Sequence, residues 1–332
     1  MKIAIFDAES IEIDKFKNEL KEYEIEVFRE NIQNVDIELY KNSEIISVFI
    51  HSKLDRATIS NMPNLKLIVT RSTGYEHIEL EVCKQKAIYV SNVPFYGENT
   101  VAEHTFALIL SLSRNIHKTY IRTINNNFSL ENLQGFDLKG KTLGVIGAGR
   151  IGLHLIRMAK GFGMNILAYD VKRDNFLADI MDFQYTHIEN ILKNSDVISL
   201  HAPLNKATHH LINTGNINLI KKGAVLVNTS RGGLIETEAL VEALDKGIIS
   251  GVGLDVFEGE EYILEEGCKL RDEYSDEVKR LIEQDCSLLH RENVVITPHN
   301  AFNSREAVER IFTETIRNIN EFISGSPANL VL

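Results

Sequence analysis

A glycine-rich turn near the middle of the chain has the spacing of a phosphate-binding loop. Gly147, Gly149 and Gly152 follow the apolar run Leu143–Ile146, and the helical pattern Ile151–Ala159 comes directly after them. In such a strand–turn–helix the first glycine permits the tight turn and the second lets a pyrophosphate approach the backbone. The third lets the helix pack closely on the strand. The turn therefore predicts a dinucleotide site, whereas a glycine cluster without this context more often only ends a helix.

An acidic residue stands at the end of the next predicted strand. Asp170 comes 18 residues after Gly152 (170 − 152). A carboxylate at this position accepts hydrogen bonds from the adenosine ribose and repels a 2′-phosphate, which favours NAD over NADP. Lys172 and Arg173 follow closely and weaken that preference. The predicted cofactor is NAD.

Three residues at other strand ends have the types needed to oxidise a secondary alcohol. That reaction requires a base for the hydroxyl proton, a cation that binds the substrate, and a partner that orients the base. Arg231 lies in a glycine-flanked turn, from which a guanidinium can bind a carboxylate through two hydrogen bonds. His299 follows Thr297-Pro298 and is the candidate acid–base, with Glu260 as the carboxylate that fixes its tautomer. The alternative is that each is an ordinary surface residue, and only the strand-end position distinguishes them.

Further loops follow predicted strands and contribute to the same prediction. They are His201-Ala202-Pro203, Asn228–Gly233 and Asp255. Because the carboxyl ends of parallel strands meet at one edge of a sheet, these loops would line one crevice together with the glycine turn. The four segments together favour a cofactor site over four unrelated loops.

Other chemistries lack their sequence signatures. There is no H-E-x-x-H motif or Cys/His cluster for a metal, no G-x-S-x-G elbow of a hydrolase, and no G-x-x-x-x-G-K loop of an NTPase. His209 and His210 are adjacent, so we expect their rings to lie on different faces of a solvent-exposed helix. No metal site is predicted.

The elements that must position these residues form two alternating series. In the first hundred residues, five apolar runs alternate with polar helical stretches, which predicts parallel strands joined by crossover helices. A long buried helix is predicted over Asn99–Asn115 from its apolar spacing. The predicted strands are Lys2–Phe6, Ile25–Phe28, Ile45–Ile50, Leu65–Thr70 and Ile88–Asn92, and the helices include Ser10–Lys21 and Asp55–Met62.

The second series begins after the polar stretch Asn125–Lys141. Six strands with crossover helices are the number in a complete doubly wound dinucleotide domain. The predicted strands are Thr142–Ile146, Asn165–Tyr169, Asp196–Leu200, Ala224–Asn228, Gly251–Asp255 and Asn293–Thr297, with helices at Arg150–Phe162, Ile188–Lys193 and Thr237–Lys246. A last amphipathic helix is predicted at about Ser304–Ile323.

The predicted fold class is therefore α/β, with two Rossmann-like doubly wound parallel-sheet domains. The length of 332 residues suits two domains. Residues 1–98 plus 300–332 would form a discontinuous substrate-binding domain, and residues 99–299 an inserted NAD-binding domain. Ligands of such sheets bind at the strands' carboxyl ends and often between domains, so we expect the chemistry in the interdomain cleft.

Composition and charge exclude several classes of partner. Hydrophobic residues make up 44% and charged residues 25% of the chain, as in ordinary globular proteins. The net charge of −11 disfavours nucleic acid and membrane surfaces as partners. No signal peptide or membrane-spanning run is evident, and Cys83, Cys268 and Cys286 are odd in number and widely spaced. We therefore predict reduced thiols in a soluble cytoplasmic protein.

The motifs together resemble those of the D-isomer-specific 2-hydroxyacid dehydrogenases. The resemblance covers nearly the whole chain and agrees with an NAD domain inserted into a discontinuous substrate domain. Members of the family are commonly homodimers, with the helix matching Asn99–Asn115 in the interface. The resemblance rests on Val93-Pro94 with Asn99–His104, on Leu143–Gly152, on Asn228–Gly233, on Gly253–Glu260 and on Thr297–Ala301.

By position, the resemblance implies a catalytic Arg231, an acid–base His299 and a carboxylate partner for that histidine. Glu258 and Glu261 compete for the partner's role, but the family spacing favours Glu260, five residues after Asp255 (260 − 255). The implied cofactor contacts are Gly147, Gly149, Arg150, Ile151, Gly152, Asp170, Ala202, Pro203, Thr208, Thr229, Ser230, Arg231 and Asp255.

The resemblance also implies a small-molecule substrate. Arg71-Ser72-Thr73-Gly74 is similar to the segment whose backbone N–H groups bind the substrate carboxylate. Pro94-Phe95-Tyr96 and Phe302 are most similar to D-lactate dehydrogenases, which surround a small 2-oxo acid with aromatic residues. The implied reaction interconverts pyruvate with NADH and D-lactate with NAD⁺. The alternatives are another 2-oxo acid, such as hydroxypyruvate, glyoxylate or a branched or aromatic one, and a non-catalytic NAD(H) sensor.

Two features depart from the family pattern. His51 stands where these enzymes usually present a tyrosine or an aliphatic residue to the substrate's side chain. The preferred side chain therefore stays open. The charged stretch Tyr262–His290 is longer than in many members, and we expect a solvated surface excursion or lid there.

Overall fold

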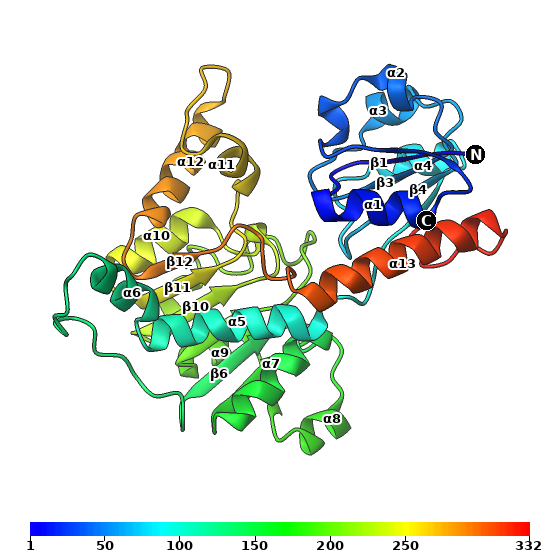
Figure 1. Cartoon of the computed structure of the whole chain (residues 1–332). Helices are drawn as coiled ribbons and strands as arrows, with labels where there is room; N and C mark the ends of the chain where they lie inside the picture. The colour runs from blue at the N-terminus through cyan, green and yellow to red at the C-terminus, as the bar shows by residue number, and fades with distance from the viewer. The chain divides into compact units, whose positions relative to one another are not determined.

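A computed structural model describes the backbone of all 332 residues and every side chain except those of Leu264, Glu265 and Glu266. The chain forms two compact units (Figure 1). Unit 1 comprises Met1–Tyr96 and Ser304–Leu332, and unit 2 comprises Gly97–Asn303. No helix among the described residues combines the length and apolar character needed to cross a bilayer.

Unit 1 is a five-stranded parallel sheet with helices on both faces. The strand order is β2-β1-β3-β4-β5, which reverses direction at β1 as in a doubly wound sheet. On one face Phe16 of α1 and Phe312 of α13 pack together, with ring centroids 4.9 Å apart. The elements are β1 Lys2–Ile5, α1 Ser10–Glu19, β2 Glu24–Val27, a 3₁₀ turn Ile32–Asn34, α2 Ile37–Tyr40, β3 Ile45–Val48, α3 Arg56–Ser60, β4 Leu67–Thr70, α4 Leu80–Gln85, β5 Tyr89–Ser91 and α13 Arg305–Ile323.

Unit 2 is a seven-stranded parallel sheet in the order β12-β11-β10-β9-β6-β7-β8. Its strands are β6 Thr142–Ile146, β7 Asn165–Tyr169, β8 Gln184–Tyr185, β9 Val197–Leu200, β10 Ala224–Asn228, β11 Ile249–Leu254 and β12 Val294–Ile296. Its helices are α5 Glu98–Ser113, α6 Ile116–Ile124, α7 Arg150–Gly161, α8 Asn175–Ile180, α9 Ile188–Asn194, α10 Thr237–Asp245, α11 Glu260–Glu266 and α12 Asp276–Leu289, with 3₁₀ turns at Ile217–Leu219 and Gly232–Leu234.

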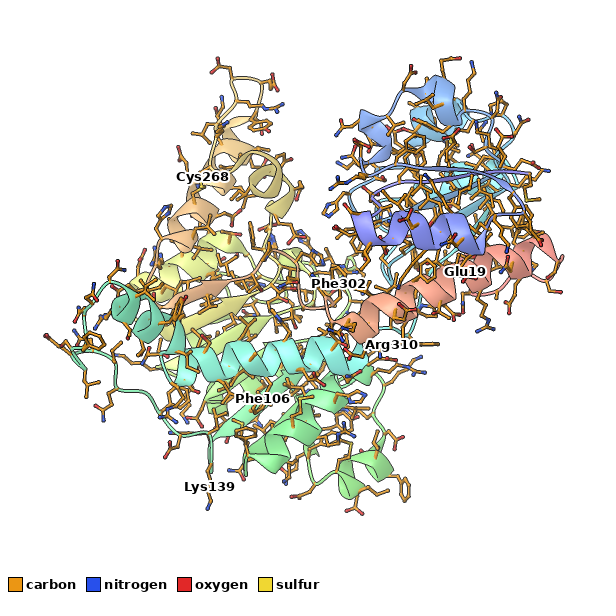
Figure 2. All side chains as sticks on the ribbon, viewed as in Figure 1. Glu19, Phe106, Lys139, Cys268, Phe302 and Arg310 are labelled. Atoms are coloured by element: carbon orange, nitrogen blue, oxygen red, sulfur yellow. A yellow bond between two sulfur atoms is a disulfide. The ribbon has the colours of Figure 1, made fainter. Side chains whose placement is uncertain are left out.

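The long helix α5 packs across one face of this second sheet. A Cβ added to Gly253 of β11 would lie only 3.1 Å from the Cβ of Leu108, so a glycine in the strand admits the helix. Phe106, which Figure 2 labels on α5, contacts Phe162 at the end of α7, and their ring centroids lie 4.7 Å apart. The sheet edge that carries the carboxyl ends of β6, β9, β10 and β11 is thereby fixed on a packed layer.

The predicted fold class is confirmed, and two local expectations are wrong. A seventh strand, β8, was not predicted because two residues are too few to show a period. The stretch Tyr262–His290 is not a simple surface excursion. It contains α11 and α12, and α12 is amphipathic, begins at the capping residue Ser275, and buries Ile282 and Leu288.

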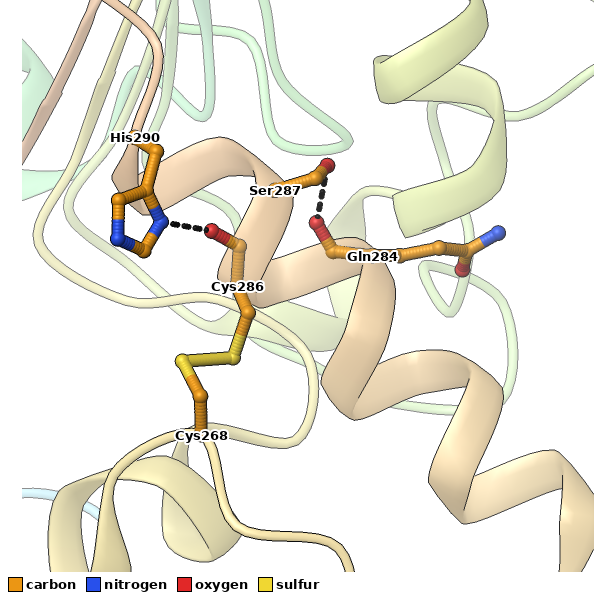
Figure 3. Close-up of a disulfide and its surroundings, with 5 residues drawn as sticks. All are labelled: Cys268, Gln284, Cys286, Ser287 and His290. Atoms are coloured by element: carbon orange, nitrogen blue, oxygen red, sulfur yellow. Dashed lines mark hydrogen bonds between the residues drawn. A yellow bond between two sulfur atoms is a disulfide. The ribbon is translucent and has the colours of Figure 1, made fainter.

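The prediction of reduced cysteines is wrong for two of the three. Cys268, just after α11, and Cys286, on α12, form a disulfide with Cα atoms 5.9 Å apart (Figure 3). Cys83 is free and buried. Counting and spacing cysteines missed the pair because the chain turns back between α11 and α12, which brings residues 18 positions apart into bonding distance. The disulfide joins the segment that follows α11 to α12.

Candidate active site

The glycine turn after β6 has the geometry that a dinucleotide requires. Gly147 has φ +103°, and a Cβ there would lie 2.5 Å from the carbonyl carbon of His201. A Cβ on Gly152 would lie 2.2 Å from the carbonyl oxygen of Gly147. Gly149 precedes the first residue of α7, and no heavy atom lies within 4 Å of its Cβ position. The turn is therefore closed beneath the helix and open at the helix N-terminus, where backbone N–H groups bind a pyrophosphate.

The other predicted cofactor residues on this side lie at the ends of β7 and β9. Asp170 follows β7, is half-buried, and accepts a hydrogen bond from the N–H of Lys172 at 2.8 Å. After β9, the Thr208 hydroxyl donates to the carbonyl of Pro203 at 2.6 Å, which fixes that loop. Ala202 is buried beside it, Ile151 is half-buried on α7, and Arg150 lies 3.4 Å from Glu98.

The loop after β10 is held by hydrogen bonds within unit 2. Asn228 is buried and donates from Nδ2 to the carbonyl of Arg231 at 2.9 Å. The Thr229 hydroxyl pairs with that of Thr105 on α5 at 2.7 Å, and the Ser230 hydroxyl donates to the carbonyl of Ala202 at 2.7 Å. These side chains shape the loop, which leaves its backbone and Arg231 at the sheet edge.

Arg231 stands beside the segment that leads to Glu260. Its Nη1 donates to the carbonyl of Ser230 at 2.8 Å, and the side chain is partly buried. A Cβ on the neighbouring Gly232 would lie 2.1 Å from the carbonyl oxygen of Phe257. This position therefore requires glycine, and the contact places the Arg231 turn directly against the start of α11.

Glu260 and His299 form a hydrogen-bonded pair. Oε1 of Glu260 lies 2.9 Å from Nδ1 of His299, and each side chain is 23% exposed. Oε2 of Glu260 accepts from the N–H of Phe257 at 3.4 Å. The competing Glu258 instead pairs with His210 at 2.6 Å, and Glu261 is exposed. The structure thus brings Glu260, of the three candidates, to the histidine.

Asp255 holds the backbone around His299. Its Oδ1 accepts from the Thr297 hydroxyl at 2.5 Å and from the N–H of Asn300 at 2.8 Å, and its Oδ2 accepts from the N–H of Ala301 at 2.8 Å. His299 itself has φ +51°, which is uncommon for a residue with a side chain. The carboxylate is 1% exposed, and these three hydrogen bonds hold the loop that carries His299; its contact with the cofactor stays a prediction.

His104 belongs to the same network and was missed as a functional candidate. Its Nε2 lies 3.0 Å from the Thr297 hydroxyl and 3.5 Å from Oδ1 of Asp255. Its motif, Asn99–His104, was noted in the sequence, but a histidine on a predicted buried helix gave no sign of its partner on β12's loop. It supports the loop that carries His299.

The expectation for His209 and His210 is wrong. They lie in a turn, not a helix, and their rings stack with centroids 3.9 Å apart at 26°. His210 is half-buried with φ +50°, and its Nε2 reaches Glu258. These three side chains bring ligand atoms within 4.8 Å of one another.

His201 is another half-buried histidine at this edge, and its Nδ1 is buried. Burial lowers the pKa of His201 to about 4, so its ring is neutral at physiological pH. Its Nε2 lies 2.9 Å from the Ser199 hydroxyl, and its Nδ1 has no hydrogen-bond partner among the described residues. A neutral buried ring fits a structural residue beneath the glycine turn rather than a second acid–base group.

The predicted substrate residues are divided between the units. In unit 1 the Arg71 guanidinium is buried and donates to the carbonyls of Phe6 and Asp7, both at 2.7 Å, so it fixes the end of β1. The Ser72 hydroxyl donates to the carbonyl of Gly74 at 2.6 Å, and the Thr73 hydroxyl donates to the carbonyl of Val93 at 3.0 Å. The carbonyl of Tyr96 accepts a hydrogen bond from Arg310. His51 is exposed, and Phe302, in unit 2, is half-buried.

Comparison with known proteins gives these residues a family context. Residues 106–301, more than half of the chain, match the model for the NAD-binding domain of D-isomer specific 2-hydroxyacid dehydrogenases. The chain is 34% identical to the D-lactate dehydrogenase of Escherichia coli K12, covering 98% of each, and 34% identical to a glyoxylate reductase of Thermococcus litoralis, covering 100% of this chain and 97% of the relative.

A solved structure supports the same family assignment through its fold and its bound cofactor. The D-lactate dehydrogenase of Aquifex aeolicus, complexed with NAD and lactic acid, superimposes with a TM-score of 0.86 at 38% identity, covering 98% of this chain and 96% of that one. The glycine turn, the open helix N-terminus and Asp170 fit NAD without further assumptions. The chain belongs to the NAD-binding, D-isomer-specific 2-hydroxyacid dehydrogenase family.

Proposed function

We propose that this protein interconverts D-lactate and pyruvate: (R)-CH₃CH(OH)COO⁻ + NAD⁺ ⇌ CH₃COCOO⁻ + NADH + H⁺. The observation that carries the proposal is the 2.9 Å pair between Glu260 and His299 beside the Arg231 turn. An imidazole oriented by a carboxylate, next to a guanidinium, is the combination that oxidation of a 2-hydroxy acid requires. The named activities of the E. coli and A. aeolicus relatives support lactate as the substrate.

Each residue has a defined task in this proposal. Arg231 and the backbone N–H groups of the loop Ser72–Gly74 bind the substrate carboxylate. In the oxidative direction Nε2 of His299 accepts the hydroxyl proton, while Glu260, on Nδ1, fixes the tautomer and stabilises the imidazolium. NAD, when bound, accepts the hydride that leaves C2. In the reductive direction protonated His299 returns the proton to the carbonyl oxygen.

The substrate's side chain is proposed to contact His51, Tyr96 and Phe302. Two aromatic residues suit a methyl group, which supports pyruvate over larger 2-oxo acids. His51 can also donate a hydrogen bond, which would suit the hydroxyl of hydroxypyruvate. The relative named glyoxylate reductase is as similar to this chain as the relative named D-lactate dehydrogenase, so identity alone does not choose between them.

A substrate panel tests the proposal. We expect NADH oxidation with pyruvate, 2-oxobutyrate, phenylpyruvate, hydroxypyruvate and glyoxylate to give the highest kcat/KM for pyruvate, and NADPH to be about tenfold or more worse because of Asp170. Absorbance at the nicotinamide band measures both. A maximum with another acid would replace lactate as the substrate. Tight NADH binding without turnover of any of them would defeat the enzyme proposal and favour an NAD(H) sensor.

We also propose a homodimer, formed through an apolar surface in unit 2. Helix α6 and the segment after it expose six large apolar side chains, each by more than half. Several large apolar side chains exposed within one short segment are a feature of protein interfaces. The patch adjoins α5, the helix that the family resemblance places in the interface. Its members are Ile116, Tyr120, Ile121, Ile124, Phe128 and Leu130.

A charge in this surface should separate the copies. We expect Ile121→Asp to convert the dimer to a monomer at micromolar concentration, since an unpaired buried carboxylate costs several kcal/mol. Sedimentation velocity measures the mass. Ile11→Asp is the matched control, because Ile11 is also an exposed isoleucine, 74% against 56% for Ile121, but lies on α1 of unit 1. A wild-type protein that sediments as a monomer would refute the homodimer.

A further inference from the structure

Asp285 on α12 is a buried carboxyl group that forms no ion pair with the described residues. The residue is 1% exposed, and neither oxygen has a hydrogen-bond partner among the described residues. A buried carboxylate that lacks both a cation and hydrogen bonds costs several kcal/mol, so such a group is carried in its neutral, protonated form. A buried acid without hydrogen bonds lowers the stability of the fold, so its presence at this position needs an explanation other than stability.

The surroundings of Asp285 are acidic and include the catalytic carboxylate. Its Oδ2 lies 3.3 Å from the position a Cβ on Gly259 would occupy, directly before Glu260. Three carboxylates, those of Glu258, Glu261 and Glu260, are near enough to act on its charge, and the Thr237 hydroxyl of α10 also lies near it. Burial, and then these three carboxylates, raise the pKa of Asp285 to about 8.

The helix that carries Asp285 is fixed in place on two sides. The next residue, Cys286, is bonded to Cys268, in the segment that follows the helix beginning at Glu260 (Figure 3). On the other side Arg280 forms an ion pair with Glu238 of α10 at 2.5 Å, and Leu288 is buried in the core. Asp285 therefore cannot readily turn out to solvent when it loses its proton.

We propose that Asp285 is a positioning residue for the Glu260–His299 pair: neutral, it underlies Gly259 without adding charge, and ionised, it adds a negative charge beside Glu260 that stabilises protonated His299. The inference rests on the proposed function, since it concerns the proton that His299 delivers. Its consequence is that reduction of the 2-oxo acid persists to higher pH than the Glu260–His299 pair alone would allow. As the pH rises, the negative charge that Asp285 gains favours the protonated form of His299 and so offsets part of the loss of that form.

The pH profile of Asp285→Asn tests this directly. Asparagine has the shape of the neutral acid but cannot ionise, so kcat/KM for NADH-dependent reduction should be within twofold of wild type at about pH 6. At alkaline pH the midpoint of the decline should move down by about half a pH unit, because the variant lacks one nearby negative charge. Glu283→Gln, an exposed position on the same helix, is the control and should leave the midpoint unchanged. A midpoint equal to wild type in Asp285→Asn would overturn the proposal.

Two readouts do not depend on turnover. The wild-type infrared spectrum should contain a carboxylic-acid C=O band that disappears as the pH rises through about 8 and is absent from Asp285→Asn. The folded pKa exceeds the unfolded value, so the wild-type free energy of unfolding should fall as pH rises between about 4 and 8, and less so in the variant. Absence of the acid band at neutral pH would refute a neutral Asp285. Lack of any wild-type turnover would instead defeat the proposed function, with the band still reporting on Asp285.

Discussion

His299→Ala should lower kcat/KM for pyruvate reduction by about 10³- to 10⁴-fold, because in the proposed function it removes the group that exchanges the proton. NADH affinity should stay within about twofold, because the loss concerns the transition state rather than cofactor binding. We expect a large effect because Glu260, 2.9 Å from Nδ1 of His299, holds the imidazole in one orientation, so that it needs no rearrangement before proton transfer. Steady-state assays and a titration of NADH fluorescence measure the two quantities separately.

Two variants make this result specific. Glu260→Gln should produce a smaller loss, about 10- to 100-fold, because the imidazole remains but its carboxylate support is gone. His290→Ala, at an exposed position after α12, should be close to wild type. A His299→Ala protein that retains more than a tenth of wild-type activity would show that another group delivers the proton.

Gly152→Ala should weaken both the fold of unit 2 and its hold on NADH. The added methyl group would lie 2.2 Å from the carbonyl oxygen of Gly147 and 3.2 Å from its carbonyl carbon, and neither backbone atom can move without opening the turn. We expect a loss of about 3 kcal/mol in the free energy of unfolding, typical of overpacking in a rigid site. NADH affinity should fall by about tenfold or more, because the same turn presents the N–H groups to the pyrophosphate.

The same helix supplies a matched control. Gly161 ends α7, and no heavy atom lies within 4 Å of its Cβ position. Gly161→Ala should therefore be neutral or stabilise the protein by up to about 1 kcal/mol through helix propensity. Thermal unfolding with and without NADH measures both variants. Equal melting temperatures for the two would contradict the role assigned to the close approach at Gly152.

Much of the fold could be predicted because its strands are continuous apolar runs. The boundaries of β6, β7 and β10 agree residue for residue with the predicted Thr142–Ile146, Asn165–Tyr169 and Ala224–Asn228. Strands buried on both faces leave no other interpretation of such runs once turn residues bound them. Where the period is weak the prediction failed, as at the two-residue strand β8 and at the charged helix α12.

The candidate site was less accessible, because its contacts depend on residues that are close only in space. Strand-end position was enough to point to Arg231, Glu260 and His299 as candidates. Strand-end position could not indicate that Glu258 pairs with His210. Nor could it indicate that Asp255 accepts hydrogen bonds from the backbone of the loop that carries His299. Asp285 carried no signal at all, since an acidic residue on a charged amphipathic segment is ordinarily solvated.

The division of the chain into two units has a consequence for how this protein can diversify. Arg231, Glu260 and His299 all belong to Gly97–Asn303, whereas His51, Ser72–Gly74 and Tyr96 belong to the other unit. In the proposed function, the residues of the chemistry and most of those that contact the substrate therefore lie in separate stretches of the gene, with Phe302 of the second unit as the exception. If those roles hold, a library restricted to residues 1–96 should change the preferred 2-oxo acid while Arg231, Glu260 and His299 stay unaltered, which makes the first unit the place to begin engineering.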